Sequence, residues 1–218
     1  MNSRPLAEAA RYLRLAPATL RSWVLGRPYP TAKDVGQFRP LIHPPDRNST
    51  VLSFWNLIEA HVLRSLRTEH GVALRAVRAS LDFAQRSLQL NRLLLSPELR
   101  TDAGQIFLDR YGHLISLSAS GQLALRRLFD EHLKRIEWDA WRFPVRLYPF
   151  LQAETLPEAT PIVIDPAIAF GRPILIRRGV STSAIAARID AGEQVSDLAS
   201  PAELAHNPSP PGRIEKWY

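Results

Sequence analysis

The chain has 218 residues, enough for one large or two modest domains, and its 45% hydrophobic and 22% charged residues are typical of a globular protein. Lys and Arg outnumber Asp and Glu by 28 to 21, and the net charge of +7 favours a polyanionic partner such as nucleic acid. The lack of cysteine excludes disulfides, thiolate metal sites and cysteine nucleophiles. The sequence shows no signal core and no apolar run of membrane-spanning length, so we expect a cytoplasmic protein.

The stretch from Pro5 to Leu25 predicts two short helices joined by a tight turn, with Pro17 near the start of the second. The apolar residues that recur at helical spacing are Leu6, Ala9, Ala10 and Leu13, then Leu20, Trp23 and Val24. A helix-turn-helix of this kind can place its second helix in the major groove of DNA. Thr19, Arg21 and Ser22 would then face outward, with side chains suited to phosphate and base-edge contacts. Spacing alone fits equally well two amphipathic helices packed in any α-rich domain.

The segment from Gly26 to Thr50 is rich in proline. Phe38, Leu41 and Ile42 favour one or two short strands within it, as in a hairpin that follows the second helix. The alternative is a plain surface loop, although so long a structureless connection is unusual inside a compact domain.

Two longer helices are predicted next. Ser53 is a suitable N-cap for a helix from Phe54 to Thr68, which Gly71 separates from a second helix. The apolar residues of that second helix are Leu74, Val77, Leu81, Ala84 and Leu88. Two core helices of unassigned purpose are the alternative interpretation.

The middle of the chain predicts a β-hairpin, with strands at Ile106 to Leu108 and Leu114 to Leu117 around a glycine turn. A long amphipathic helix from about Gly121 to Trp138 and a strand from Val145 to Tyr148 follow. The polar stretch from Leu151 to Thr160 is the predicted domain boundary.

The last part predicts a short strand from Ile174 to Ile176 and a helix from Ser181 to Asp190 that Gly192 ends. A further helix starts at Val195. We expect a second helix-turn-helix-like unit here, with a buried side made of Ile185, Ile189 and Leu198.

The pattern EAA-x-YL-x-L-x-x-x-TLR-x-W, from Glu8 to Trp23, resembles the opening of MerR-like winged-helix DNA-binding domains. With the helix pair that follows, the resemblance runs from Pro5 to about Leu88. It implies that the second helix reads DNA and that a wing after it touches the DNA backbone. The positions it assigns to DNA contact are Thr19, Arg21 and Ser22 in the helix, with Tyr29 and Arg39 in the wing.

The C-terminal part resembles a small family of uncharacterised domains common in bacterial toxin–antitoxin pairs. The residues that carry this resemblance are V-I-D-P at 163–166, F-G-R-P at 170–173 and G-V-S-T-S-A-I-A-A-R at 179–188. Such domains follow a MerR-like head in antitoxins of VapBC-like pairs, whose toxins are PIN-like ribonucleases. The sequence departs from that family after Pro201, where prolines interrupt an expected helix.

These observations predict a mainly α-helical fold with short β-hairpins. A MerR-like winged helix-turn-helix would occupy residues 1–90, an α/β connecting region 91–155 and a small helix-turn-helix-like α domain 156–218. The resemblance implies an antitoxin that binds operator DNA and a PIN-like ribonuclease toxin, as a homodimer or a larger hetero-oligomer. The alternative is a solitary MerR-like regulator whose C-terminal domain dimerises or binds an effector.

Arginines are the predicted means of silencing the toxin, because a guanidinium group can pair with nuclease carboxylates and displace their metal. The candidates are Arg172, Arg177, Arg178 and Arg213, with Trp217 and Tyr218 as apolar anchors. A solvated surface charge is the alternative for each arginine. The six histidines show no metal-ligand spacing, and Asp165 before a proline suits a turn cap better than a catalytic carboxylate. We therefore expect no enzyme activity, no cofactor and no metal.

Overall fold

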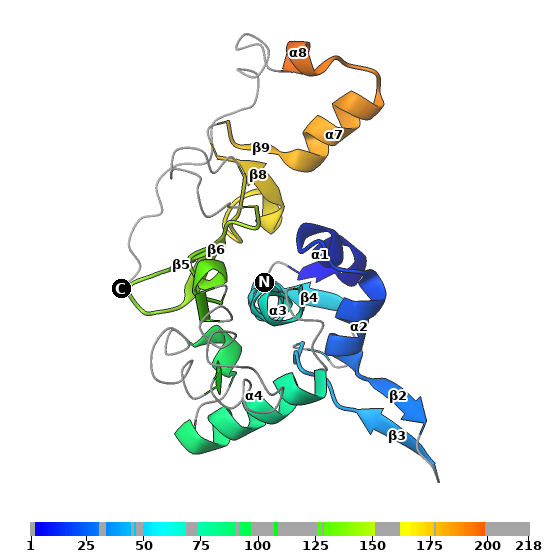
Figure 1. Cartoon of the computed structure of the whole chain (residues 1–218). Helices are drawn as coiled ribbons and strands as arrows, with labels where there is room; N and C mark the ends of the chain where they lie inside the picture. Colours follow the sequence, from blue (N-terminus) through cyan, green and yellow to red (C-terminus); the bar gives the residue numbers. More distant parts are fainter. Residues whose placement is uncertain are drawn as a thin grey trace.

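The computed structural model describes residues 3–30, 34–44, 46, 50–68, 74–89, 92–96, 107–108, 126–127, 129–150, 162–176 and 178–198. Helices α1 (Leu6–Tyr12) and α2 (Pro17–Leu25) pack together at the start of the chain (Figure 1). Their predicted apolar stripe is confirmed, since every member is buried: Leu6, Ala9, Ala10, Leu13, Leu20, Trp23 and Val24. Pro17 occupies the first turn of α2, where its missing N–H costs no hydrogen bond.

An antiparallel hairpin follows α2 directly, made of β2 (Arg27–Pro30) and β3 (Val35–Phe38). Gly26 joins α2 to β2 with a φ of +73°, and a Cβ at this position would clash with the carbonyl oxygen of Phe38. The predicted strand content was right for Phe38 and wrong for Leu41 and Ile42. The amides of these two residues instead donate to the carbonyl oxygen of Trp23, at 2.7 and 3.0 Å, and so satisfy a group at the end of α2.

Strand β1 (Ser3–Pro5) pairs antiparallel with β4 (Val51–Ser53), which leads into α3 (Phe54–Thr68). The bounds of α3 are those predicted, and Ser53 is its cap: the Ser53 Oγ accepts the Asn56 amide proton at 3.2 Å. Helix α4 (Leu74–Leu88) is also confirmed, and the 3-10 helix η1 (Leu93–Leu95) packs against α3 and α4. Figure 1 shows α3 between the α1–α2 unit and strands β5 and β6.

The second half of the described chain contains a five-stranded antiparallel sheet in sequential order. Its strands are β5 (Ile136–Trp138), β6 (Pro144–Leu147), β7 (Ile162–Ile164), β8 (Pro173–Leu175) and β9 (Val180–Ser181). The expected mainly α-helical architecture is therefore corrected to a mixed α/β one. Leu147 of β6 is opposite Ile164 of β7, so the sheet joins strands from both sides of the predicted domain boundary.

Two expectations for the middle of the chain were wrong. The predicted long helix does not reach Trp138, because residues 136–138 pair with β6 as a strand, where Ile136 is buried. Phe107 and Leu108 are helical and buried instead of lying in a strand. The rest of the predicted hairpin at 106–117, and the boundary segment itself, lie outside the described residues.

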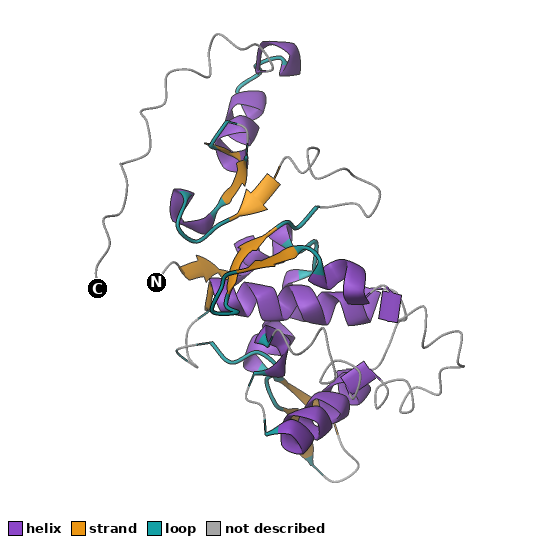
Figure 2. Cartoon of the chain, turned by 90° about the vertical axis from the view of Figure 1, so that its left-hand side faces the viewer, coloured by secondary structure: helices purple, strands orange, loops and turns teal. Residues whose placement is uncertain are grey.

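Helices α7 (Thr182–Asp190) and α8 (Val195–Leu198) follow the sheet at the positions predicted. Ser181 caps α7, and Gly192, with a φ of +93°, lies just after its end. The expected buried side of this unit was wrong. The side chains of Ile185, Ile189 and Leu198 are half-buried or exposed and line an open hollow of about 300 Å³, together with Leu175 of β8 and Val180 of β9. Figure 2 shows both helices at the far end of the molecule from the hairpin.

Candidate nucleic-acid interface

Helix α2 carries the three residues that the sequence assigns to DNA reading. Arg21 is exposed, whereas Thr19 and Ser22 are half-buried. The Ser22 hydroxyl donates to the carbonyl oxygen of Thr19 at 2.8 Å, so its proton is already used within the helix. Of the three, Arg21 has the side chain best placed for an outside partner.

The hairpin β2–β3 presents an ordered aromatic pair. The rings of Tyr29 and Phe38 are 4.1 Å apart between centroids, across the two strands. The Tyr29 ring also covers Gly36, where a Cβ would lie 2.5 Å from the ring Cζ. Glycine at this position therefore allows Tyr29 to lie flat on the hairpin, which positions the predicted wing residue.

Two arginines lie close to the ring of Phe38. The guanidinium groups of Arg27 and Arg78 lie 5.4 and 5.6 Å from the centroid of its ring, within cation–π range. Arg78 comes from α4 and also donates to the main-chain carbonyl of Arg39, so it connects the base of the hairpin to that helix. Burial lowers the pKa of Arg78, and the charge of Asp82 opposes this shift. Sequence reasoning missed Arg27 and Arg78, and no spacing signal pointed to Arg78.

The four arginines form what we call the basic hairpin surface: Arg21, Arg27, Arg39 and Arg78. Figure 1 shows that the hairpin projects from the body next to α2, on the side away from β5 and β6. A projecting hairpin beside an exposed helix, both bearing guanidinium groups, is suited to bind phosphates along a groove.

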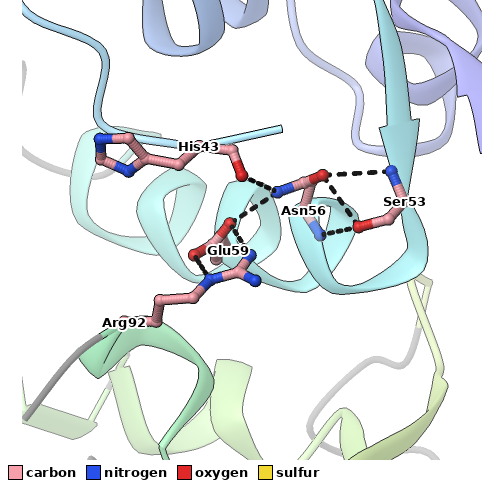
Figure 3. A network of polar contacts seen from close by, with 5 residues as sticks. All are labelled: His43, Ser53, Asn56, Glu59 and Arg92. Atoms are coloured by element: carbon pink, nitrogen blue, oxygen red, sulfur yellow. Dashed lines mark hydrogen bonds and ion pairs between the residues drawn. The ribbon is translucent and has the colours of Figure 1, made fainter. Parts of the chain in front are cut away.

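A buried polar network holds the segment after the hairpin (Figure 3). The Asn56 Nδ2 donates to the carbonyl oxygen of His43 at 3.1 Å and to the Glu59 Oε2 at 3.0 Å. The Arg92 guanidinium donates to both oxygens of Glu59, at 3.0 and 2.9 Å. These bonds tie the chain that leaves the hairpin to α3 and η1, and so help to fix the hairpin on the body.

The structure describes two of the predicted toxin-contact residues. Arg172 and Arg178 are both exposed, the first just before β8 and the second in the turn after it. They therefore lie at opposite ends of this strand and do not form one cluster. Arg177, Arg213, Trp217 and Tyr218 lie outside the described residues.

Asp165 has the structural role expected of a residue before proline. Its Oδ1 accepts the Ala167 amide proton at 2.8 Å, and its Oδ2 binds Arg146 at 2.8 Å. Among the described residues, no three His, Asp or Glu side chains gather as a metal site would require. None of the described helices is both long and apolar enough to cross a membrane.

No family model matches the chain. The chain is similar to a Mycobacterium tuberculosis protein named "Putative antitoxin VapB45": the two are 28% identical, and the match covers 86% of this chain and 82% of that protein. This likeness supports the antitoxin family. The fold is also similar to the crystal structure of Rv2018 from Mycobacterium tuberculosis, with a TM-score of 0.61, 23% identity and 91% of each chain covered. At that identity the second likeness shows a shared fold.

Proposed function

We propose that the chain is the antitoxin of a type II toxin–antitoxin system. In this role it binds and neutralises a PIN-like ribonuclease toxin in the cytoplasm and represses its own operon by binding DNA, without catalytic activity of its own. The similarity to VapB45 over 86% of the chain carries the proposal. The MerR-like pattern from Glu8 to Trp23 and the toxin–antitoxin motifs of the C-terminal part support it.

The basic hairpin surface supports the DNA-binding half of this proposal. In a winged helix-turn-helix, α2 is the reading helix and β2–β3 is the wing. Arg21 is exposed on α2, Arg39 is exposed directly after β3, and Tyr29 lies on β2. A homodimer would place two such units on an inverted repeat, since helix-turn-helix dimers bind paired half-sites.

The toxin-binding half rests on arginine chemistry. A metal-dependent nuclease holds its metal with clustered carboxylates, and an inserted guanidinium group can pair with them instead. Arg172 and Arg178 are the described candidates, and a three-residue strand between them separates them by roughly 10 Å. We therefore propose that they contact different carboxylates, with Arg177, Arg213, Trp217 and Tyr218 as further contacts.

Co-purification from the native operon, with only this chain tagged, tests the proposal. We expect a stoichiometric small partner whose ribonuclease activity appears when this chain is removed. We also expect the complex to retard its own promoter DNA in a salt-dependent manner. Isolation of the chain without a partner would contradict the antitoxin function.

The alternative function is that of a solitary MerR-like regulator, and one observation favours it. A hollow of about 370 Å³ lies at the base of the hairpin. The residues that line it include Arg39 after the hairpin, Arg78 and Leu81 of α4, and Leu93 of η1. This volume suits a small molecule, and Arg78 connects the hollow to the hairpin. If the chain purifies alone, still binds its promoter and changes its DNA affinity with a small effector, the solitary regulator is correct.

A further inference from the structure

The hollow of about 370 Å³ at the base of the hairpin is formed by four segments that lie far apart in the sequence: the chain just after β3, α3, α4 and η1. Helix α4 supplies one wall with residues at helical spacing, namely Arg78, Leu81, Asp82 and Gln85. The polar network of Figure 3 connects α3, η1 and the chain after the hairpin, so the other walls are fixed in place. A fixed hollow of this volume is within the range of small-molecule sites.

One hydrogen-bond donor in the wall of this hollow is not used by the fold. The Arg78 Nη2 donates to the main-chain carbonyl of Arg39, but the Arg78 Nε is buried and has no hydrogen-bond partner among the described residues. A buried N–H group without an acceptor costs free energy, which an acceptor atom of a ligand would recover. Burial also lowers the pKa of Arg78, as expected for a cation that has lost part of its hydration. An oxygen atom bound beside this guanidinium group would replace what burial removed.

The charges of the lining residues leave one positive charge in excess. Three arginines and two carboxylates line the hollow: Arg39, Arg78, Arg92, Glu59 and Asp82. Both oxygens of Glu59 accept from Arg92, so this pair is complete. Asp82 lies one helical turn from Arg78, and its charge offsets that of Arg78. Within the described residues the Arg39 side chain has no ion pair or hydrogen bond. With His43 counted as neutral, the lining therefore suits a ligand with a single negative charge.

Apolar side chains line the rest of the hollow. They are those of Pro40, Leu41, Leu81, Leu93 and Leu94. An inorganic anion would leave these side chains without a contact, whereas a ligand with a hydrocarbon part would bury its apolar surface against them. A mainly apolar wall with a few polar groups that fix the orientation is typical of sites for small organic molecules. The lining therefore fits a ligand that carries both an anionic group and an apolar body.

We propose that this hollow binds a small organic carboxylate, which pairs with Arg39 and Arg78 and competes with promoter DNA. The carboxylate accepts from the two guanidinium groups, and the hydrocarbon part lies against the leucines. The competition rests on the proposed function, in which Arg39 contacts the DNA backbone. The binding of the carboxylate itself does not depend on that function, and it holds with or without a toxin partner.

The direction of the effect follows from the shared arginine. A guanidinium group that is neutralised by a bound carboxylate releases no counter-ion from DNA, so one phosphate contact is lost. The bound carboxylate therefore weakens promoter binding. Because linkage is reciprocal, promoter DNA must weaken binding of the carboxylate by the same factor, which we expect to be about fivefold or more.

Calorimetric titration of the full chain with three probes tests the binding site. The probes are naphthoate, which is an aromatic carboxylate, naphthamide, which has the same shape without the charge, and inorganic phosphate. Naphthoate should bind about tenfold or more tightly than naphthamide, because hydrogen bonds to an ionised group are the stronger ones. It should also bind about tenfold or more tightly than inorganic phosphate, which has no apolar part to bury.

A matched pair of variants on α4 locates the site. Gln85→Glu places a carboxylate in the wall of the hollow and should weaken naphthoate binding about tenfold or more through like-charge repulsion. Arg86→Gln is the control, because it changes the net charge by the same amount on the same helix, at an exposed residue that does not line the hollow. It should change naphthoate affinity less than about threefold, since exposed charges at a distance are screened. Equal thermal midpoints of the two variants verify that both are folded.

Promoter titrations with and without saturating naphthoate test the competition. The wild type should lose promoter affinity by about fivefold or more, and Arg86→Gln should respond in the same way. If naphthoate binds no better than naphthamide or phosphate, or if both variants bind it equally, the site is wrong and the antitoxin function stands. Promoter affinity that naphthoate leaves unchanged would overturn the competition. A chain that binds naphthoate as expected but no promoter DNA would support the site and contradict the proposed DNA binding.

Discussion

The Glu59 carboxylate, almost completely buried in α3, is neutralised by Arg92, whose guanidinium group donates to both of its oxygens at 3.0 and 2.9 Å. Asn56 supplies a third hydrogen bond to the same carboxylate. A buried charge with one ionic partner depends strongly on that partner, because removing it leaves an uncompensated carboxylate.

We therefore expect Arg92→Ala to lower the free energy of unfolding by about 1–3 kcal/mol, less than for a fully buried pair because Arg92 is partly exposed. Urea unfolding at neutral pH measures this. The double variant Glu59→Gln/Arg92→Ala should recover part of the loss, since a neutral amide needs no counter-ion. The control Arg86→Ala, an exposed arginine on α4, should cost less than about 0.5 kcal/mol. Equal effects of the two arginine substitutions would contradict the role of this pair.

A matched pair of glycines tests the connection between α2 and the hairpin. Gly26 and Gly192 both have positive φ, +73° and +93°, but only at Gly26 would a Cβ clash with neighbouring backbone. Gly192→Ala should cost about 1 kcal/mol from backbone strain alone. Gly26→Ala should cost clearly more and should also weaken promoter binding, because the hairpin must shift. A smaller effect at Gly26 than at Gly192 in thermal unfolding would show that Phe38 does not constrain this turn.

The basic hairpin surface predicts a particular salt dependence. Arg21→Ala and Arg39→Ala should each weaken promoter binding, and each should reduce the slope of log K against log salt by about 1 if the arginine contacts a phosphate. If Arg21 reads a base, its loss should instead relax sequence preference by about 1–3 kcal/mol at one position. Lys134→Ala is the control, because Lys134 is an exposed cation paired with Glu131 just before β5. A salt titration that gives all three variants the wild-type slope would exclude this surface.

His61 predicts how stability changes with pH. It is fully buried, its Nε2 donates to the carbonyl oxygen of His132 at 3.1 Å, and burial lowers its pKa from 6.5 to about 3. Between pH 6.5 and pH 3, His61 is protonated in the unfolded chain but neutral in the folded chain. Because the unfolded state binds the extra proton, the free energy of unfolding falls as the pH drops through this range. Between pH 7 and pH 5 the loss should be roughly 2 kcal/mol.

Comparison of unfolding at the two pH values checks this. His61→Gln should be less stable than the wild type at pH 7 but should lose less stability on going to pH 5. His43→Gln, which replaces an exposed histidine, is the matched control. If His61→Gln keeps the pH dependence of the wild type, protonation of His61 is not the cause of the loss of stability at pH 5.

Local sequence patterns predicted the structure correctly where a segment's conformation depends mainly on its own residues. Helix α3 has the predicted bounds because Ser53 caps it and its apolar stripe has a regular helical period. Strand β2 was not predicted, because Pro28 and Pro30 are unfavourable in a strand interior; this two-stranded edge tolerates them. Leu41 and Ile42 have apolar side chains typical of a strand, but their amides donate hydrogen bonds to the end of α2 instead of to a neighbouring strand.

Long-range pairing was beyond sequence reasoning. The β6–β7 pairing joins residues on either side of a polar stretch that resembles a linker. The apolar sequence of Ile162–Ile164 predicts a strand but does not indicate which strand pairs with it. Ile185 and Ile189 were correctly predicted to lie on a helix. Helical periodicity does not show whether another element packs on these residues, and here they line an open hollow. Among the site residues, Arg21 was predicted from helical spacing and Arg39 from a family resemblance, whereas Arg78 required the folded positions of α4 and the hairpin.

The pairing of β1 with β4 has a consequence for the timing of synthesis. Ser3 pairs with Ser53, so the first strand has no partner until about fifty further residues have been made, which takes roughly 3–10 s at ordinary translation rates. During that interval α1 and α2 can form, but the ladder that joins them to α3 cannot. The growing chain thus becomes able to hold α2 in place through this ladder only after the ribosome has passed the hairpin and the start of α3.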